Sequence, residues 1–207
     1  MSSARAVVFL DYQNVYNGAR EAFGLRGDPS RYGQIDPLQL AEAIVARHPE
    51  ESHVAGVRVY RGRPDSAKQP RAYGANMRQS AAQERRGRGL VTVITRTLRY
   101  PTDWPDEPAQ EKGIDVALAV DFVTMAVAHE YDIGVMMSTD TDLIPALEAV
   151  MKLSGTSYPR CEVAAWSKRG AYSRRLHVPG RKLWCHWLSD DVYGSIEDAT
   201  DYNLPSS

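Results

Sequence analysis

Residues 132–150 read DIGVMMSTDTDLIPALEAV, and this stretch carries the strongest structural and chemical signal of the chain. Its first part, "DIGVMM", is a short apolar run typical of a buried strand, and "LIPALEAV" has the spacing of a helix. Two carboxylates, Asp140 and Asp142, lie where the strand gives way to the helix. Acids at such a junction cap the helix or bind a cation, and the other acids of the chain decide between these roles.

The same alternation of strand and helix extends over the rest of the chain. Five more short runs rich in β-branched and aromatic residues are predicted as strands: "AVVFL" (6–10), "VAGVRVY" (54–60), "LVTVITRTL" (90–98), "CEVAAW" (161–166) and "KLWCHWL" (182–188). Helical patterns are predicted over residues 14–24, 36–48, 69–87 and 112–131. Strands alternating with helices form right-handed βαβ units, so the expected fold is α/β, a three-layer α/β/α sandwich around a mostly parallel sheet.

Three local features refine this expectation. Asn14 is a candidate cap for the first helix, whereas Asp36 and Pro37 mark the start of the second. The helix over residues 112–131 is apolar nearly all round, which predicts a buried helix. Residues 99–111 are rich in proline and acid and are predicted to be a loop.

Composition limits the class of protein. The 207 residues suit one domain, which we expect over residues 1–198, followed by a flexible tail over 199–207. The net charge of −1 gives no overall bias toward a charged partner. Cys161 and Cys185 lack partners at the spacing of a zinc site, and they form no disulfide framework. Since no uninterrupted apolar run reaches about 18 residues, we expect a cytoplasmic protein that does not associate with membranes.

Four acids fall where they are expected to meet. Asp11 follows the first predicted strand, and Asp140 and Asp142 follow the fourth, so in a parallel sheet they lie at the same edge. Asp115 begins the apolar helix and would point at that edge. Carboxylates about 4 Å apart repel by roughly 1 kcal/mol even in a water-like dielectric, so the group must take up protons or bind a cation. Mg²⁺ or Mn²⁺ is expected, because no His or Cys that would favour zinc is present.

Each acid also has a structural interpretation. Asp142 could cap the helix that follows, with Pro145 in its first turn, and Asp115 could be a first-turn acid favoured by the helix dipole. Asn14 is as well suited to capping as to orienting a ligand. Asp121 lies six residues after Asp115, about 120° around the helix, so we expect a partnered structural acid rather than a metal ligand.

Three motifs occur together in this order: "FLDYQNV" (9–15), "KGIDVALAVDF" (112–122) and "MMSTDTDLIPAL" (136–147). Together they resemble the motifs of the NYN domain, a family of the PIN-like nuclease superfamily. The resemblance implies a PIN-like fold and a metal-dependent ribonuclease. It also implies the catalytic set, in which four acids hold Mg²⁺ or Mn²⁺ with an amide beside them: Asp11, Asp115, Asp140, Asp142 and Asn14. The sequence departs from the family pattern at Thr139, Thr141 and Leu143, where Gly, Ser and Phe are usual.

The reaction that the resemblance implies is two-metal hydrolysis of RNA. One ion activates a water and the other stabilises the leaving 3′ oxygen. Lys112, Ser138 and Thr139 are expected to contact the substrate, with Lys112 positioned to neutralise phosphate charge. A solvated lysine at the start of the helix is the alternative for Lys112.

Positive charge gathers in two segments, which indicates a polyanionic partner. From Arg58 to Arg99 there are eleven Lys or Arg against two acids, and from Arg160 to Lys182 there are seven against one. We expect the first segment to form a track for RNA leading to the acids. The contacts are assigned to Arg61, Arg63, Arg85, Arg86 and Arg88. A solvated helix face is the alternative.

Rival functions depend on single features of the sequence. A phosphatase with Asp11 as nucleophile needs a second Asp two residues later, where this chain has Gln13. A dehydrogenase is not indicated, because no glycine-rich phosphate-binding loop follows a predicted strand. A non-catalytic RNA-binding protein that keeps the fold stays open, and so does assembly into a homo-oligomer.

Overall fold

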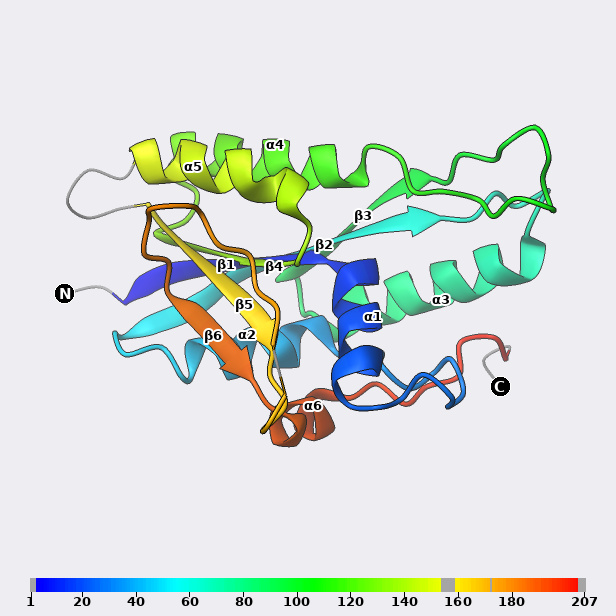
Figure 1. Cartoon of the computed structure of the whole chain (residues 1–207), viewed down its shortest axis with the longest axis horizontal. Helices are drawn as coiled ribbons and strands as arrows, with labels where there is room; N and C mark the ends of the chain where they lie inside the picture. Colours follow the sequence, from blue (N-terminus) through cyan, green and yellow to red (C-terminus); the bar gives the residue numbers. More distant parts are fainter. Residues whose placement is uncertain (1–2, 154–158, 172, 205–207) are drawn as a thin grey trace.

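The computed structural model describes residues 3–153, 159–171 and 173–204, and within them one six-stranded sheet has every pair of neighbouring strands parallel (Figure 1). The strand order is β3-β2-β1-β4-β5-β6. The strands are β1 (Ala4–Asp11), β2 (Ser52–Arg63), β3 (Val91–Thr97), β4 (Ile133–Met137), β5 (Arg160–Trp166) and β6 (Cys185–Leu188). The helices are α1 (Tyr12–Ala22), α2 (Pro37–Val45), α3 (Pro70–Arg86), α4 (Ile114–Val127), α5 (Ile144–Leu153) and α6 (Asp190–Ile196), and a 3₁₀ turn, η1 (Thr141–Leu143), precedes α5. The six predicted strands and the parallel sheet are confirmed.

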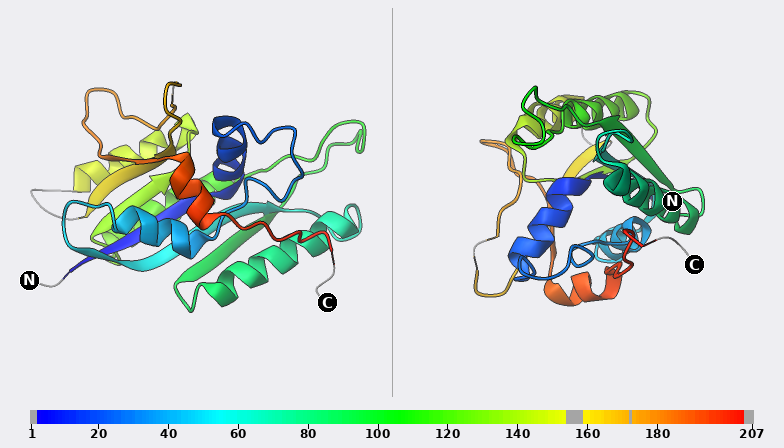
Figure 2. Two further views of the ribbon diagram at one scale, coloured as in Figure 1. Left: turned by 90° about the horizontal axis from the view of Figure 1, so that it is seen from below. Right: turned by 90° about the vertical axis from the view of Figure 1, so that its right-hand side faces the viewer.

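Helices cover both faces of the sheet. α4 and α5 lie on one face, and α1, α2, α3 and α6 lie on the other (Figures 1 and 2). The central strand β1 serves both layers, because alternate side chains of a strand point to opposite faces. Val8 and Leu10 join the core under α1 and α2, whereas Val7 and Phe9 join the core under α4 and α5. The predicted three-layer α/β/α sandwich is confirmed.

The strand order reverses beside β1, and this reversal places the acids. After β3 the chain returns to the other side of β1 to form β4. α1 then leaves β1 toward one face, and α5 follows β4 on the other. In open parallel sheets this arrangement leaves a crevice at the carboxyl ends of the strands, where ligands bind. Asp11, Asp140 and Asp142 lie at this crevice.

The two predicted helix caps have different outcomes. Asp36 caps α2, since its Oδ1 accepts hydrogen bonds from the backbone N–H groups of Leu38 (3.0 Å) and Gln39 (3.2 Å). The prediction that Asn14 caps the first helix is wrong. α1 begins two residues earlier, and the cap is Asp11, whose extended backbone leaves its Oδ1 free to accept from the N–H of Asn14 (3.3 Å).

The expectation of a fully buried helix after residue 112 is wrong for one side of α4. Val116, Val120 and Val127 are 57, 53 and 58% exposed. α4 belongs to an outer layer of the sandwich, so the sheet covers only its inner side.

None of the described helices combines the length and the apolar character that a membrane crossing requires.

The flexible tail predicted from residue 199 is corrected as far as Leu204, where the description ends. Tyr202 is buried, and its hydroxyl donates to Asp198 (2.7 Å). Its carbonyl oxygen accepts from two nitrogens of Arg78, at 2.6 and 2.9 Å. This segment therefore packs against α3 as part of the fold.

Candidate active site

Asp11 ends β1 and begins α1, so it lies at the crevice beside β4. One carboxylate oxygen accepts from the Asn14 N–H and the other accepts from the Ser138 hydroxyl (2.9 Å). Burial raises the pKa of Asp11, the hydrogen bonds from Ser138 and Asn14 oppose that rise, and the charges of Asp140 and Asp115 add to it. Asp11 therefore shares a negative field with two other acids.

Asp140 and Asp142 are held by the turn that follows β4. The Asp140 N–H donates to Ser138 Oγ (3.0 Å), and Oδ1 of Asp140 accepts from the Asp142 N–H (3.0 Å). Asp140 is thus the cap of η1. The alternative in which Asp142 caps the helix is wrong, because Asp142 lies inside the first turn.

Three carboxylates converge across the crevice. Asp115, Asp140 and Asp142 each offer an oxygen, and these oxygens lie within 4.8 Å of one another. Asp115 comes from the first turn of α4, and the other two come from the β4–α5 junction. Asp11 lies outside this group of three and is linked to Asp140 through the Ser138 hydroxyl. The acids therefore both cap helices and form a cluster.

Asn14 fixes the loop that carries two of these acids. Its Oδ1 accepts from both the backbone N–H and the hydroxyl of Thr139, each at 3.0 Å. The hydroxyl at position 139 thus adds a hydrogen bond that a glycine would not supply. Ser138 is buried between Asp11 and Asp140, so its predicted contact with substrate is corrected to an internal one.

Asp121 points away from the cluster. Its Oδ2 accepts from Arg58 Nη2 (2.8 Å) and from the Tyr60 hydroxyl (2.7 Å) on β2. The prediction of a partnered structural acid is confirmed.

Glu111 is a fifth acid at this edge, and it is not among the site residues predicted from the sequence. Its Oε1 accepts a hydrogen bond from the Gly62 N–H (2.6 Å). When the side-chain amide of Gln13 is oriented with its nitrogen toward Glu111, this nitrogen donates to both carboxylate oxygens, at 2.9 and 3.1 Å. Burial raises the pKa of Glu111, the Gly62 N–H lowers it, and the charges of Asp11 and Asp115 raise it further. The feature of the sequence that could have identified Glu111 is its position directly before the "KGID" motif (112–115).

The predicted basic track is divided by the fold. Arg61 lies at the end of β2, where its guanidinium stands 4.7 Å from the centre of the Tyr12 ring and donates to Gln79 Oε1 (2.8 Å). Arg63 follows and donates to Thr97 Oγ1 (3.2 Å). Both lie at the acid edge. Lys112 is exposed on the loop before α4, and its contact with substrate stays a prediction, as does that of Thr139.

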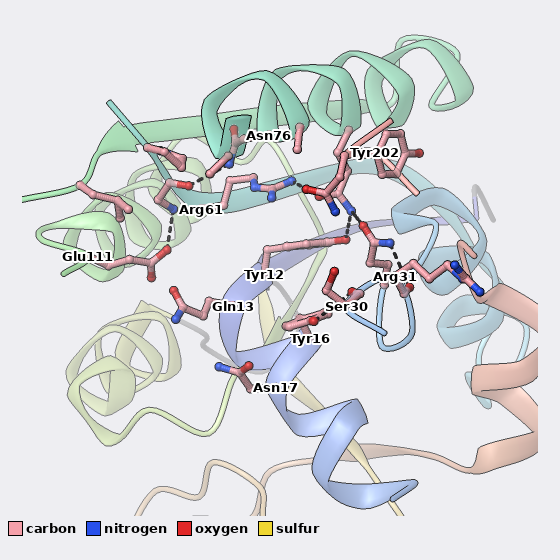
Figure 3. Close-up of a pocket in the computed structure, with 18 of the residues that line it drawn as sticks. Tyr12, Gln13, Tyr16, Asn17, Ser30, Arg31, Arg61, Asn76, Glu111 and Tyr202 are labelled. Atoms are coloured by element: carbon pink, nitrogen blue, oxygen red, sulfur yellow. Dashed lines mark hydrogen bonds between the residues drawn. The ribbon is translucent and has the colours of Figure 1, made fainter. Parts of the chain in front are cut away.

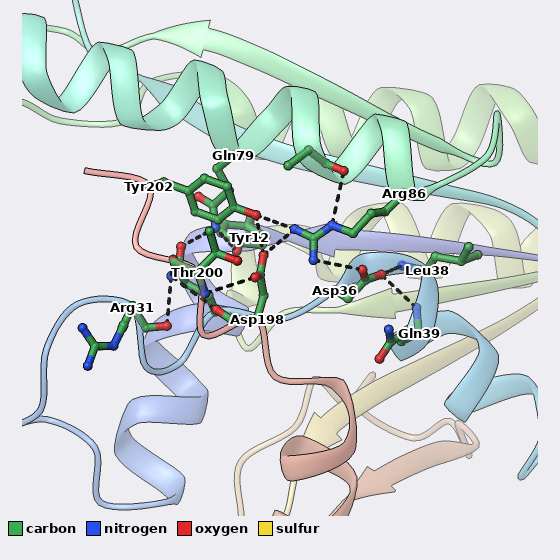
Figure 4. Close-up of polar contacts among 12 residues, drawn as sticks. Tyr12, Arg31, Asp36, Leu38, Gln39, Gln79, Arg86, Asp198, Thr200 and Tyr202 are labelled. Atoms are coloured by element: carbon green, nitrogen blue, oxygen red, sulfur yellow. Dashed lines mark hydrogen bonds and ion pairs between the residues drawn. The ribbon is translucent and has the colours of Figure 1, made fainter. Parts of the chain in front are cut away.

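Three other arginines of that track lie elsewhere. Arg86 pairs with Asp36 (3.4 Å) and Asp198 (2.7 Å), so its assignment to RNA is corrected to a structural ion pair (Figure 4). Arg85 and Arg88 are at the carboxyl end of α3, which runs back toward the start of β3 (Figure 1). A helix that connects parallel strands runs opposite to them, so this end is far from the carboxyl ends of the strands.

The donor set of the cluster suits a hard divalent cation. Carboxylate oxygens are the ligands that Mg²⁺ and Mn²⁺ prefer, and the cluster contains no His or Cys. Because three like charges lie so close together, a cation would relieve their repulsion. The residues present therefore fit such an ion.

A sequence model of the NYN domain matches residues 5–158, and the chain belongs to this family. A crystal structure of a protein of unknown function from Vibrio parahaemolyticus is similar at 20% identity, over 78% of this chain and 81% of that chain, with a TM-score of 0.48. A comparison with curated proteins finds no match. The family match ends before β5, so β5, β6 and α6 lie beyond it.

Proposed function

We propose that the protein is a ribonuclease that uses Mg²⁺ or Mn²⁺ to hydrolyse phosphodiester bonds in RNA. The observation that carries this proposal is the convergence of Asp115, Asp140 and Asp142 within 4.8 Å at the switch point of an NYN domain. RNA as substrate and a cytoplasmic location belong to the same proposal.

In this proposal, one set of residues binds the ion and a second set positions the first. Asp115, Asp140 and Asp142 would bind the ion, with Asp11 beside them. When bound, such an ion neutralises phosphate charge and promotes attack by water. Ser138 fixes Asp11 relative to Asp140, and Asn14 fixes the loop that carries Asp140 and Asp142. These hydrogen bonds preorganise the acids before substrate binds.

The test is cleavage of RNA with and without divalent ions, in the wild type and in Asp140→Asn. Cleavage should require Mg²⁺ or Mn²⁺, stop in a chelator and fall at least about 100-fold in the variant. Manganese affinity, measured by calorimetry, should fall while the melting temperature without metal stays the same or rises. Asp191→Asn, an exposed acid at the start of α6, is the matched control.

Two results contradict the proposal. Cleavage that continues in a chelator would show that the ion is not required. RNA binding without cleavage under any divalent ion would instead indicate a non-catalytic RNA-binding protein.

A further inference from the structure

A cavity of about 360 Å³ lies beside the acids (Figure 3). Its walls come from the start of α1, the end of β2, the inner side of α3, residues 30–34 and the segment 201–203. Sites for small molecules occupy about 300–1,000 Å³. The cavity is near the lower end of that range, so it suits one small group rather than a length of chain.

Aromatic rings and a fixed guanidinium line the cavity. Tyr12, Tyr16 and Tyr202 are in its walls, and Arg61 lies over the Tyr12 ring at 4.7 Å. The hydrogen bond from Arg61 to Gln79 holds the guanidinium in this place. Aromatic and guanidinium planes are the surfaces on which the bases of single-stranded nucleic acids stack.

Charge in the cavity is balanced. Its charged lining residues are Arg31 and Arg61, together with Glu111 and Asp201. A phosphate site needs an excess of positive charge. The balance therefore favours an uncharged planar group, such as a nucleobase, over a phosphate.

Two buried polar atoms beside the cavity have no hydrogen-bond partner in the described part of the chain. These are Arg61 Nε, a donor, and Asn76 Oδ1, an acceptor. The Asn76 amide is itself fixed, because its Nδ2 donates to the Gly62 carbonyl (3.0 Å). Unpaired buried polar groups are uncommon in folded proteins. Both atoms are covered by the protein itself, so they mark an incompletely satisfied wall of the cavity rather than contacts for a ligand.

The cavity borders the acid edge at Gln13 and Glu111. These two side chains lie next to each other in the wall of the cavity (Figure 3). Gln13 follows Asp11 by two residues, and the charges of Asp11 and Asp115 act on Glu111. The wall formed by Gln13 and Glu111 is therefore the part of the cavity that is near the carboxylates.

We propose that this cavity binds the base of the RNA nucleotide beside the scissile phosphate and sets the base preference of cleavage. The inference rests on the proposed function, since the neighbouring acids supply the reaction. The base stacks in the cavity, and its phosphate faces the acids.

Filling the cavity tests this inference. Ala75→Leu fills it from α3 and removes no side-chain hydrogen bond, and Ala81→Leu on the exposed side of the same helix is the matched control. If a melting curve shows that Ala75→Leu does not fold, Ala72→Leu, which lines the same cavity, replaces it. The first measurement is cleavage of short RNAs that differ at one nucleotide. The second is binding of the four nucleoside 5′-monophosphates in a chelator.

The wild type should prefer one or two bases at one position relative to the cut. Ala75→Leu should lose that preference and weaken monophosphate binding by about tenfold or more, the effect of losing one stacked base. Ala81→Leu should keep both properties, and manganese affinity should be unchanged in both variants.

The contrary outcomes separate this inference from the proposed function. If the wild type and Ala75→Leu cleave with the same base pattern, the inference is wrong and the ribonuclease stands, even if monophosphates bind. If no RNA is cleaved, yet monophosphates bind the wild type and not Ala75→Leu, the cavity is a base site and the proposed reaction is wrong. If neither cleavage nor binding occurs, both are wrong.

Discussion

Asp11 and Asp140 show at the scale of single residues that capping and charge clustering occur together. Each accepts a backbone N–H at the start of a helical turn, and each also contributes charge to the crevice. Those N–H groups offset part of the repulsion, because hydrogen bonds to the charged form of a carboxylate stabilise it. An acid that caps a helix is therefore not excluded as a metal ligand.

Asp121→Asn should affect stability rather than metal binding. The change weakens the ion pair with Arg58 and the hydrogen bond from Tyr60, which should lower the free energy of unfolding by about 1–3 kcal/mol. Asp115→Asn is the comparison, and it should lower manganese affinity. Calorimetric titration with Mn²⁺ and thermal melting measure the two effects. Equal losses of manganese affinity would place Asp121 in the metal site.

Glu162 gives the fold an acid-sensitive element at the end of the sheet opposite to the acids. Its two oxygens bond to His48 Nε2 (3.1 Å) and His186 Nε2 (2.8 Å), and all three side chains are buried. Burial alone would raise the pKa of Glu162, but the hydrogen bonds from His186 and His48 outweigh it and lower the pKa. A carboxyl whose pKa is lowered by folding contributes stability above its unfolded pKa of about 4.5, and this is lost as pH falls through the folded pKa.

Glu162→Gln should therefore cost about 1–3 kcal/mol at pH 7, and the difference from wild type should shrink below about pH 4.5. Urea unfolding across this range measures it, with exposed Glu130→Gln as control. If the free energies of unfolding of wild type and Glu162→Gln differ by the same amount down to pH 3, Glu162 is not the acid-sensitive group.

At the scale of the element, α3 separates neighbouring arginines into different roles. Arg86 reaches the nearly buried Asp36 and Asp198, whereas Arg85 is exposed. Burial alone would raise the pKa of Asp198, but the hydrogen bonds from Arg86, Tyr202 and Thr200 lower it. A cluster of basic residues in sequence is thus not one surface in space.

Arg86→Ala should cost about 2–4 kcal/mol. Removing one partner of a buried pair usually costs about 3–5 kcal/mol, and the 36% exposure of Arg86 reduces this figure through solvation. Arg85→Ala should change the free energy of unfolding by less than about 0.5 kcal/mol. Denaturant unfolding measures both. Equal effects of the two substitutions would mean that the ion pair is not structural.

If RNA is the substrate, as proposed, we predict that Lys168 and Arg174 after β5 contact it. Lys168 and Arg174 line a hollow together with Asn14 and Thr139, next to the acids. Lys168→Ala and Arg174→Ala, introduced together into the Asp140→Asn variant so that RNA is not cleaved, should weaken its binding of RNA. Each lost phosphate contact should also reduce the slope of log affinity against log salt by roughly 0.7. Arg85→Ala with Arg88→Ala is the control. A larger loss of RNA affinity from this pair would instead support the RNA track predicted from the sequence between Arg58 and Arg99.

At the scale of the whole molecule, residues 160–204 pack onto the part of the chain that the family model matches, which stops at residue 158. β6 extends the sheet and α6 covers one face. Tyr202 lines the cavity beside Tyr12 and bonds to Arg86 (Figure 4). The wall of the cavity thus joins the start of α1 to residues 201–203, which are nearly 190 positions further along the sequence.

Removing residues 199–207 should lower the free energy of unfolding by at least about 2 kcal/mol, because Arg78 loses the Tyr202 carbonyl and Asp198 loses the Tyr202 hydroxyl. Tyr202→Phe, which keeps the ring and removes the hydroxyl, should cost only about 1 kcal/mol. Thermal melting measures both. An unchanged melting temperature after truncation would show that this segment contributes nothing to the fold.

The sequence by itself determined the strands, the parallel sheet and the meeting of Asp115, Asp140 and Asp142. These follow from local periodicity and from a geometric rule that brings the ends of parallel strands to one edge. The structural role of Asp121 was also predictable, because helical phase is a local property.

Only the tertiary structure decided that Asp11 and Asp140 cap helical turns, which arginines bind acids, and where the cavity beside Tyr12 lies. Glu111 meets Gly62 across 49 positions of sequence, and Arg86 meets Asp198 across 112. Such contacts depend on how separate elements pack, and no local pattern of residues records that packing. Asp11 rather than Asn14 caps α1 for the same reason: the sheet holds Asp11 extended at the end of β1, and an extended backbone is what a cap requires.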